Sequence, residues 1–600
     1  MLRATADSLV EATRGSLVLG HGEHIVRGLS IDSRDVRVGG AFLALPGEKS
    51  DGHDHLRAAI DAGAHVLIVT RPLAELGDVE ADARARGVAV ILVDEAQDAL
   101  ADVAVWHRAG LNCRVVGITG SSGKTTTKDL LASVLSTTFR TVSTSGNRNN
   151  EIGLPLTVLS AGPDTEVLIV EMGMRGAGQI AHLCEIARPT HGLVTNVGTS
   201  HIELLGTQEA IADAKGELVG AIPQSGCVCL NGDDSYSAHL ARLSAAPVRL
   251  YGLGETADVS ASNVRTDEGG CAHFTLRAGG AEVPVELGTP GRHNVYNALA
   301  AGAVAVEFGV DLGNIASGLH SAVMTGMRME SFVTADGVTV INDAYNANPA
   351  SMAAAVETLA SQEIPGRRIA VLGDMAELGS LEPLAHFIVG EQVAASGIEV
   401  LVTIGERALR IGDGAGAAGM PVQNRFSCST VEEVLDVLDD VAGPGDTVLV
   451  KASRVMGLES VVGRLSSPWW RPPFSSHSGS ACCASETSGN RCVLMARKVT
   501  WSSRALPPWE AYSFSWWSPS RFCSSERQPV RVCWLLGPPW PAGVWALSTT
   551  GRRWRMSGRW DYDRAPSCLD RLPSRSSSVY WRSIGRMCPR GFRYRSRHRG

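Results

Sequence analysis

Short apolar runs alternate with amphipathic stretches along most of this chain. In the first hundred residues, residues 55–62 follow a helical period, and β-type apolar runs fall at 28–31, 41–45, 65–69 and 88–93. The alternation continues after residue 110 and returns between residues 366 and 460. Strands that alternate with helices build parallel sheets with helices on their faces. The pattern therefore predicts an α/β protein.

Six hundred residues are too many for one hydrophobic core, so we expect several domains. The pattern predicts a small α/β domain over residues 1–110, a central nucleotide-binding domain over 111–325 and a Rossmann-like domain over 326–465. The remaining segment, residues 466–600, shows no sustained helix or strand period.

One stretch has the form of a phosphate-binding loop. The apolar run 115–118 leads into a helix-period stretch at 128–135 through Gly120, Ser121, Ser122, Gly123, Lys124, Thr125 and Thr126. In such a loop, backbone N–H groups converge on phosphate oxygens at the positive end of a helix, Lys124 adds charge, and Thr125 offers a hydroxyl to Mg²⁺. The common pattern has a glycine where this chain has Ile118. The flanking strand and helix nevertheless favour ATP or GTP binding over a chance surface turn.

The composition changes near residue 465. Residues 1–465 hold 33 Lys and Arg against 56 Asp and Glu, whereas residues 466–600 hold 22 against 6, with 12 of the 13 tryptophans. A basic, aromatic segment can be an arm for nucleic acid or anionic lipid. The tryptophans stand in unpatterned contexts, so we instead interpret residues 466–600 as the product of a shifted reading frame. We therefore expect no nucleic-acid partner.

The acidic part of the chain is typical of a cytoplasmic protein. Its six cysteines are scattered, without the spacing of a zinc site or a disulfide framework. No apolar run reaches 18 residues, and no signal-like apolar core follows the first residues. We expect neither export nor membrane insertion, and we expect a monomer.

Polar side chains follow the phosphate loop where a nucleotide enzyme needs them. Glu171 ends an apolar run, and a carboxylate at the carboxyl end of a strand is a natural Mg²⁺ ligand. His201, in the loop after the next run, is a second candidate metal ligand, although a lone loop histidine is more often solvated. An amide-rich loop suited to a polar substrate or phosphates contains Asn147, Asn149 and Asn150.

Lys215 lies on the apolar face of an expected helix. Ile211, Lys215, Leu218 and Ile222 recur at helical spacing. Burial would favour the neutral amine, which can react with CO₂ to give a carbamate, an anionic metal ligand. The alternative is a lysine that extends from the edge of the helix to solvent.

Further polar groups follow in the second half of the chain. Asn294 and Asn297 are three residues apart on one helix face and could read an adenine edge. Residues 343–351 form a loop so rich in amide, carboxylate and phenol groups that it would be costly unless it bound a ligand.

Two loops of the first domain combine hydrogen-bond donors with flexible glycines. One contains Ser33 and Arg34, and the other spans residues 47–53 and contains Asp51, Gly52 and His53. Both could hold a phosphate, although solvated turns are the simpler interpretation on local sequence alone.

Residues 414–419 match the dinucleotide-binding fingerprint G-x-G-x-x-G letter for letter. No strand precedes them, and residues 408–411 have a helical pattern. We therefore interpret residues 414–419 as a flexible loop and not as a nicotinamide site.

Taken in order, these motifs resemble the Mur ligase family over about residues 25–460. The resemblance rests on the phosphate loop and on residues 147–150, Glu171, 196–201, 214–217, 291–297, Arg328 and 343–349. Residues 343–349 and 373–379 resemble in particular the members that add D-alanyl-D-alanine to a UDP-linked muramoyl tripeptide.

The resemblance implies an ATP-driven amide ligase of peptidoglycan precursor synthesis with two Mg²⁺ sites. Its substrates would be UDP-N-acetylmuramoyl-tripeptide and D-alanyl-D-alanine. The UDP-linked tripeptide would be held by Ser33, Arg34, Asp51, Gly52 and His53, with Asn147, Asn149 and Asn150. The metal ligands would be Thr125, Glu171, His201 and Lys215 as its carbamate. Lys124 and Arg328 would contact phosphates, Asn294 and Asn297 the adenine, and Asp343 the nucleotide at a domain hinge. The dipeptide would lie near Tyr345, Asn346 and Asn348.

Two other functions stay open. One is a sister amide ligase, either of the type that adds a diamino acid to a shorter muramoyl peptide or of the folyl-polyglutamate type. Residues 343–349 argue against both types. The other is a scaffold that binds a nucleotide without ligation.

Overall fold

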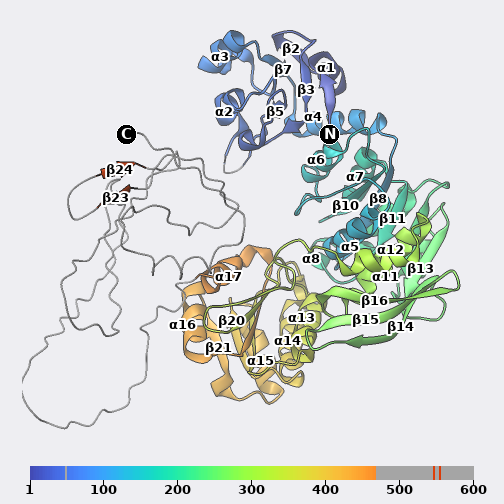
Figure 1. Cartoon of the computed structure of the whole chain (residues 1–600), viewed down its shortest axis with the longest axis vertical. Helices are drawn as coiled ribbons and strands as arrows, with labels where there is room; N and C mark the ends of the chain where they lie inside the picture. The colour runs from blue at the N-terminus through green and yellow to red at the C-terminus, as the bar shows by residue number, and fades with distance from the viewer. Residues whose placement is uncertain (48–49, 468–544, 548–552, 556–600) are drawn as a thin grey trace, which may run out of the picture. The chain divides into compact units, whose positions relative to one another are not determined.

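The computed structural model describes residues 1–47 and 50–467, together with two short strands, β23 (Trp545–Leu547) and β24 (Arg553–Arg555), which pair antiparallel. Nearly all of the segment that we interpret as shifted in frame therefore lies outside the described residues. The described part contains three sheets of five or more strands with helices between them, coloured blue, green and yellow-orange in chain order (Figure 1). The α/β prediction is confirmed, and the domain boundaries stay predictions.

The first domain is built on a five-stranded sheet of order β2-β7-β6-β5-β4, in which β2 alone is antiparallel to its neighbour. Strands β4 to β7 and helix α2 are the elements that the sequence predicts. In chain order the elements are β1 (Arg3–Thr5), α1 (Ala6–Thr13), β2 (Ser16–Leu19), β3 (Ile25–Arg27), β4 (Leu29–Ser30), η1 (Ser33–Asp35), β5 (Ala41–Leu43), η2 (Gly52–His55), α2 (Leu56–Asp61), β6 (Val66–Val69), η3 (Leu73–Glu75), α3 (Asp78–Arg86), β7 (Ala89–Leu92) and α4 (Ala96–Ala109).

The central domain is built on a nine-stranded sheet of order β16-β15-β14-β13-β12-β11-β8-β10-β9. The strands from β9 to β14 are parallel, and β15 and β16 extend the sheet as antiparallel strands. In chain order the elements are β8 (Arg114–Thr119), α5 (Lys124–Ser136), β9 (Thr141–Ser143), α6 (Gly153–Ser160), β10 (Val167–Glu171), α7 (Gln179–Ala187), β11 (His191–Val194), α8 (Ile202–Leu205), α9 (Gln208–Ala221), β12 (Cys227–Asn231), α10 (Ser237–Ala241), β13 (Val248–Gly252), β14 (Val259–Thr266), β15 (Cys271–Ala278), β16 (Ala281–Pro290), α11 (Asn294–Glu307) and α12 (Leu312–His320).

Strand β8 is the centre of this domain because side chains pack on both of its faces. Val116 and Ile118 are fully buried in the cluster that includes residues of α5 and α11, and Val115 is buried in the cluster on the opposite face, with residues of α9. At Gly117 an added Cβ would lie 2.7 Å from a methyl carbon of Leu218. The missing side chain therefore lets α9, which carries Lys215, pack directly against the strand that leads into the phosphate loop.

The third domain is built on a six-stranded sheet of order β17-β18-β22-β19-β20-β21, parallel except for β17. In chain order the elements of this domain are β17 (Glu330–Val333), β18 (Thr339–Asn342), α13 (Pro349–Ser361), β19 (Arg368–Gly373), η4 (Gly379–Leu381), α14 (Glu382–Ala395), β20 (Val400–Ile404), α15 (Leu409–Ala417), η5 (Val422–Asn424), β21 (Arg425–Cys428), α16 (Val431–Val441), β22 (Thr447–Lys451), η6 (Arg454–Met456) and α17 (Glu459–Leu465).

No helix in the described part of the chain is long and apolar enough to cross a membrane.

The prediction of a flexible loop over residues 414–419 is wrong, because α15 continues through most of the segment. Its glycines serve close packing of α15 against α14: an added Cβ at Gly414 would lie 2.0 Å from the Phe387 carbonyl oxygen, and one at Gly390 would lie 2.0 Å from the Ile411 carbonyl oxygen. Tertiary packing thus compensates for the low helix propensity of glycine. That these residues form no nicotinamide site stays a prediction.

Helix α17 sets the point at which the chain can be shortened. Leu465, its last residue, is 1% exposed and belongs to the core of the third domain, whereas Ser466 is exposed. We therefore expect a chain that ends at Ser467 to keep the ligase activity that the resemblance implies. It should also become more soluble, because the removed segment holds 12 tryptophans and seven cysteines, and such residues favour aggregation wherever they are exposed. Specific activity and the soluble fraction after expression would measure this. Loss of activity, or of a measured affinity for nucleic acid or lipid, would instead support a functional basic arm.

Candidate active site

A cavity of about 1080 Å³ lies at the carboxyl ends of the central parallel strands and extends to the third domain. Phosphate-binding sites of open α/β sheets occur where the strand order reverses, and here β8 lies between β10 and β11. Many of the predicted site residues line this cavity: Ser121, Ser122, Gly123, Lys124, Thr125, Thr126, Asn147, Asn149, Asn150, Glu171, His201, Asn294, Asn297, Arg328, Asp343, Tyr345, Asn346 and Asn348.

The phosphate loop needs both of its glycines. Gly120 and Gly123 have φ angles of 151° and 79°, which other residues rarely adopt. An added Cβ at Gly120 would lie 1.8 Å from the Thr195 hydroxyl oxygen, and one at Gly123 would lie 2.3 Å from Asn297 Oδ1. The backbone N–H of Ser122 donates to Asn196 Oδ1 at 3.0 Å, so the loop is also held from the end of β11.

Lys124 begins α5 and folds back over the loop. Its Nζ donates to the Gly120 carbonyl oxygen at 2.6 Å. Burial lowers the pKa of Lys124, and the Glu171 carboxylate acts in the opposite direction. A bound phosphate would add negative charge beside the ammonium and so favour its charged form.

Glu171 joins the phosphate loop to the amide-rich loop. The Thr125 hydroxyl donates to Glu171 Oε2 at 2.8 Å, and Asn149 Nδ2 donates to Glu171 Oε1 at 2.9 Å. The residue Glu171 is 2% exposed. Arg328, from the segment before β17, places its guanidinium in the same cluster, where Nη2 donates to the Thr125 hydroxyl at 2.9 Å. The Thr125 hydroxyl and the Glu171 carboxylate, both possible metal ligands, therefore lie close to the guanidinium of Arg328 and the ammonium of Lys124.

His201 is held by a residue that the sequence analysis did not select. Its Nδ1 lies 2.5 Å from Glu377 Oε2, a contact between the central and third domains, and Arg175 Nε lies 3.7 Å from the other oxygen of Glu377. Both His201 and Glu377 have positive φ angles, 67° and 61°. Burial lowers the pKa of His201, and the Glu377 carboxylate opposes the shift. Nδ1 is thereby occupied, and Nε2 is left for another ligand.

Lys215 is 1% exposed, so the alternative of a lysine that extends to solvent is wrong. Its helix, α9, buries Ile211 and Leu218 on the same face, as the spacing predicts. Burial lowers the pKa of Lys215 well below its usual value, and the Lys124 cation lowers it further. In the described part of the chain no acceptor forms a hydrogen bond with its amine. A buried amine without a partner is favoured in its neutral form.

Asn294 and Asn297 begin α11 and are bonded to each other, with Asn297 Nδ2 donating to Asn294 Oδ1 at 2.8 Å. Their remaining side-chain groups are also engaged: Thr127 donates to Asn297 Oδ1 at 3.2 Å, and Asn294 donates to the Pro290 carbonyl oxygen at 2.7 Å. Both side chains line the cavity, and these bonds fix their orientation beside Gly123.

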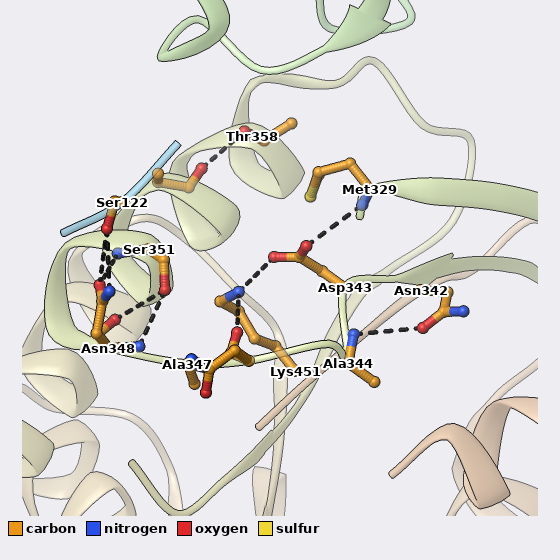
Figure 2. Close-up of polar contacts among 12 residues, drawn as sticks. Ser122, Met329, Asn342, Asp343, Ala344, Ala347, Asn348, Ser351, Thr358 and Lys451 are labelled. Carbon is orange, nitrogen blue, oxygen red and sulfur yellow. Dashed lines mark hydrogen bonds and ion pairs between the residues drawn. The ribbon is translucent and has the colours of Figure 1, made fainter. Parts of the chain in front are cut away.

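The loop between β18 and α13 is tied down at both ends, as Figure 2 shows. Lys451 Nζ bonds Asp343 Oδ2 at 2.5 Å and the Asn346 carbonyl oxygen at 2.9 Å. Asn348 caps α13 through a reciprocal pair of bonds with Ser351. Its Nδ2 also donates at 3.0 Å to the hydroxyl oxygens of Ser122 and Ser200 in the central domain.

The first-domain residues gather in two separate turns outside this cavity. Arg34 forms an ion pair with Asp32 at 2.6 Å, and its hydrogen bonds lower the pKa of Asp32 to about 2. Asp51 accepts a bond from the His53 backbone at 2.8 Å and pairs with Arg71 at 2.5 Å. Ser33 lies in η1, and Gly52 begins η2. No described residue of these turns makes a hydrogen bond or ion pair with the phosphate loop.

The sequence analysis gives no individual role to three residues of this site, although it uses residues 196–201 and 373–379 as motifs. Asn196 and Lys451 line the cavity, and Glu377 holds His201. Each stands just beyond or at the carboxyl end of a parallel strand, which is where ligand-binding residues of such sheets occur. That position was an available signal for Lys451 and Asn196. Glu377 lies inside the 373–379 segment, but no local pattern indicates a contact with a histidine 176 residues away.

Comparison with known proteins follows the same division of the chain. Three family models match: Mur ligase family, catalytic domain, at residues 25–108; Mur ligase middle domain at 118–305; and Mur ligase, glutamate ligase domain, at 327–454. Among curated proteins, the UDP-N-acetylmuramoyl-tripeptide–D-alanyl-D-alanine ligase of Bacillus subtilis is 37% identical over 464 residues, which cover 77% of this chain and 98% of that protein. The ligase of the same name from Mycobacterium tuberculosis (strain H37Rv) is 41% identical, with 73% and 91% covered.

Solved structures of proteins named as MurF also match this chain. A crystal structure of MurF from Acinetobacter baumannii matches with a TM-score of 0.68 at 30% identity and covers 78% of this chain and 99% of its own. The MurF ligase from Thermotoga maritima in complex with ADP matches with a TM-score of 0.61 at 28% identity, with 74% and 98% covered. About three quarters of this chain therefore aligns with more than nine tenths of the length of each of these relatives. The chain belongs to the Mur ligase family.

Proposed function

We propose that this chain is an ATP-dependent ligase that joins D-alanyl-D-alanine to UDP-N-acetylmuramoyl-tripeptide and so makes the pentapeptide precursor of peptidoglycan. The observation that carries the proposal is the cavity, in which the phosphate loop, the Thr125–Glu171 pair and the polar loop that begins at Asp343 line one space. The two curated relatives, named for this reaction, support it over more than nine tenths of their length.

The reaction joins two groups that do not react by themselves in water. A carboxylate oxygen of the tripeptide attacks the γ-phosphorus of ATP, the bond to ADP breaks, and an acyl phosphate forms. The amine of the dipeptide then attacks the acyl carbon, loses a proton and expels inorganic phosphate. Both reactants of the first step are anionic, so the cations Lys124 and Arg328 would offset their repulsion and stabilise the transferred phosphoryl group.

The residues present fit Mg²⁺, which would supply charge that draws the carboxylate and the γ-phosphate together. The Thr125 hydroxyl and the buried Glu171 carboxylate offer hard oxygen ligands 2.8 Å apart. Other protein ligands are few, because no three His, Cys, Asp or Glu side chains of residues 1–47 and 50–467 lie close enough together to hold a metal ion. A carbamate on the buried amine of Lys215 would add a further anionic ligand, and His201 would add a nitrogen ligand. We propose two Mg²⁺ sites on this set.

The remaining side chains would hold the substrates. The backbone of the phosphate loop, Asn294, Asn297 and Asp343 would hold ATP. The first-domain turns at Ser33–Arg34 and Asp51–His53 would hold the UDP portion of the tripeptide, since Arg34 offers an exposed guanidinium. Contacts to the tripeptide and the dipeptide would come from Asn147, Asn149, Asn150, Tyr345, Asn346 and Asn348.

We also propose that the chain acts as a monomer in the cytoplasm. Its six described cysteines are all free thiols, as a reducing compartment allows. The proposed substrates, ATP and a UDP-linked peptide, are nucleotides of that compartment.

Phosphate release should require ATP, Mg²⁺, UDP-N-acetylmuramoyl-tripeptide and D-alanyl-D-alanine together, because the acyl phosphate leads to product only when an amine acceptor is present. Release of inorganic phosphate by the purified full-length chain, with one component omitted at a time, would measure this. Efficient replacement of the dipeptide by a single D-amino acid, a diamino acid or glutamate would assign the chain to a sister ligase. ATP binding without release under any combination would indicate a scaffold.

A further inference from the structure

Lys451, the last residue of β22, is buried beside the cavity but has no part in the chemistry described above. Its side chain is 3% exposed, and its ammonium bonds Asp343 Oδ2 at 2.5 Å (Figure 2). The ammonium also donates to the Asn346 carbonyl oxygen at 2.9 Å. One buried cation therefore holds two points of the loop that follows β18. A buried charge is costly unless it is paired in this way.

Asp343 connects Lys451 to the segment that carries Arg328. Its second oxygen, Oδ1, accepts a bond from the backbone N–H of Met329 at 3.3 Å. Met327 and Met329 have φ angles of 63° and 52°, a conformation that is unfavourable for residues other than glycine and persists only where neighbours impose it. Arg328 lies between these two strained residues, so the direction of its side chain depends on a turn that Asp343 helps to hold.

A second route runs from Lys451 to the same guanidinium. Tyr345 lies one residue before Asn346, whose carbonyl oxygen Lys451 binds, and the guanidinium of Arg328 lies 4.2 Å from the centre of the Tyr345 ring. The backbone N–H of Tyr345 also donates to the Met327 carbonyl oxygen at 3.4 Å. Both routes end where Arg328 Nη2 donates to the hydroxyl of Thr125 in the phosphate loop.

We infer that Lys451 is a positioning residue, which orients Arg328 toward the phosphates by holding Asp343 and the Asn346 carbonyl. The inference rests on the proposed function for the role of Arg328, and the contacts that carry it are independent of the amine acceptor. A lysine that only stabilised the third domain would affect folding without affecting nucleotide binding through Arg328.

Replacement of Lys451 by methionine keeps most of the side-chain volume and removes the cation. We expect the affinity of the full-length chain for ATP, measured by calorimetry with Mg²⁺, to fall about tenfold, within the range found for residues that share one network. The matched control is Arg367→Met, which breaks a 2.8 Å ion pair with Asp446 just before the other end of β22. It should lower the melting temperature and leave ATP affinity unchanged.

A double-mutant cycle separates positioning from stability. If Lys451 acts through Arg328, then Lys451→Met should weaken ATP binding much less once Arg328→Met is present, whereas Arg367→Met should show no coupling to it. Equal effects of Lys451→Met in both backgrounds would overturn the inference. If Lys451→Met does not fold, Asp343→Asn tests the same link, since the amide keeps an acceptor for Met329 but loses the charge; it should show the same coupling, and additivity would overturn the inference. Failure of the wild-type chain to turn over the dipeptide would refute the proposed function but leave this cycle readable.

Discussion

Lys124→Ala should lower the turnover of phosphate release at least about a hundredfold while the fold stays intact, because one charge-stabilising contact in the transition state is worth roughly 3 kcal/mol. The side chain does not belong to a hydrophobic core: its ammonium bonds the Gly120 carbonyl oxygen over the cavity. Its loss removes positive charge from the place where the phosphoryl group is transferred. Steady-state kcat at saturating ATP would measure the loss of turnover, and circular dichroism with a thermal melt would show whether the fold stays intact.

Arg140→Met is the matched control for this variant. Arg140 is a cation close to the far end of α5, where it pairs with Glu166 at 3.5 Å with a side chain that is 67% exposed. Surface pairs of this kind contribute little to stability, so this variant should keep both its melting temperature and its turnover. A Lys124→Ala variant that retained more than half of the wild-type rate would exclude the proposed role of the phosphate loop.

The features that the sequence predicts are those that local pattern determines. Residues 115–118 read as a strand because apolar residues buried on both faces form a continuous run, and the structure buries Val116 and Ile118 on one face and Val115 on the other. Lys215 could be placed on the buried face of α9 because Ile211 and Leu218 recur around it at helical spacing. In both places the period of the chain alone indicates which side chains face the core.

The features that the sequence does not predict depend on contacts between distant segments. The bond between His201 and Glu377 joins two domains, and both residues have left-handed backbones that no local propensity favours. Residues 414–419 look like a loop by composition, and only the close approach of α14 explains why α15 keeps its glycines. The link from Lys451 to Arg328 likewise exists only once β18 and β22 are neighbours in one sheet.

Lys215→Ala should lower turnover about as strongly as Lys124→Ala, by roughly a hundredfold or more if the anion that it carries holds a metal that offsets charge in the transition state. The melting temperature should fall, as it does when other buried side chains are truncated, but the variant should still fold. The amine makes no hydrogen bond within the described residues, so its removal leaves no acceptor without a donor. Steady-state kinetics and a thermal melt of the purified variant would measure the two effects.

Short carboxylic acids should partly restore the activity of Lys215→Ala. A carbamate and a small carboxylate present the same pair of oxygens, and the truncated side chain leaves space for the acid at the position that the carbamate would occupy. Formate, acetate and propionate would be titrated against the variant and against two controls. Lys124→Ala loses a cation, so an added anion should not rescue it. Leu218→Ala shortens a buried neighbour on the same face of α9, so it should lower the melting temperature without any response to acid. Absence of rescue by all three acids, or a crystal structure with two metals bound and an unmodified Lys215 amine, would show that the lysine carries no carbamate.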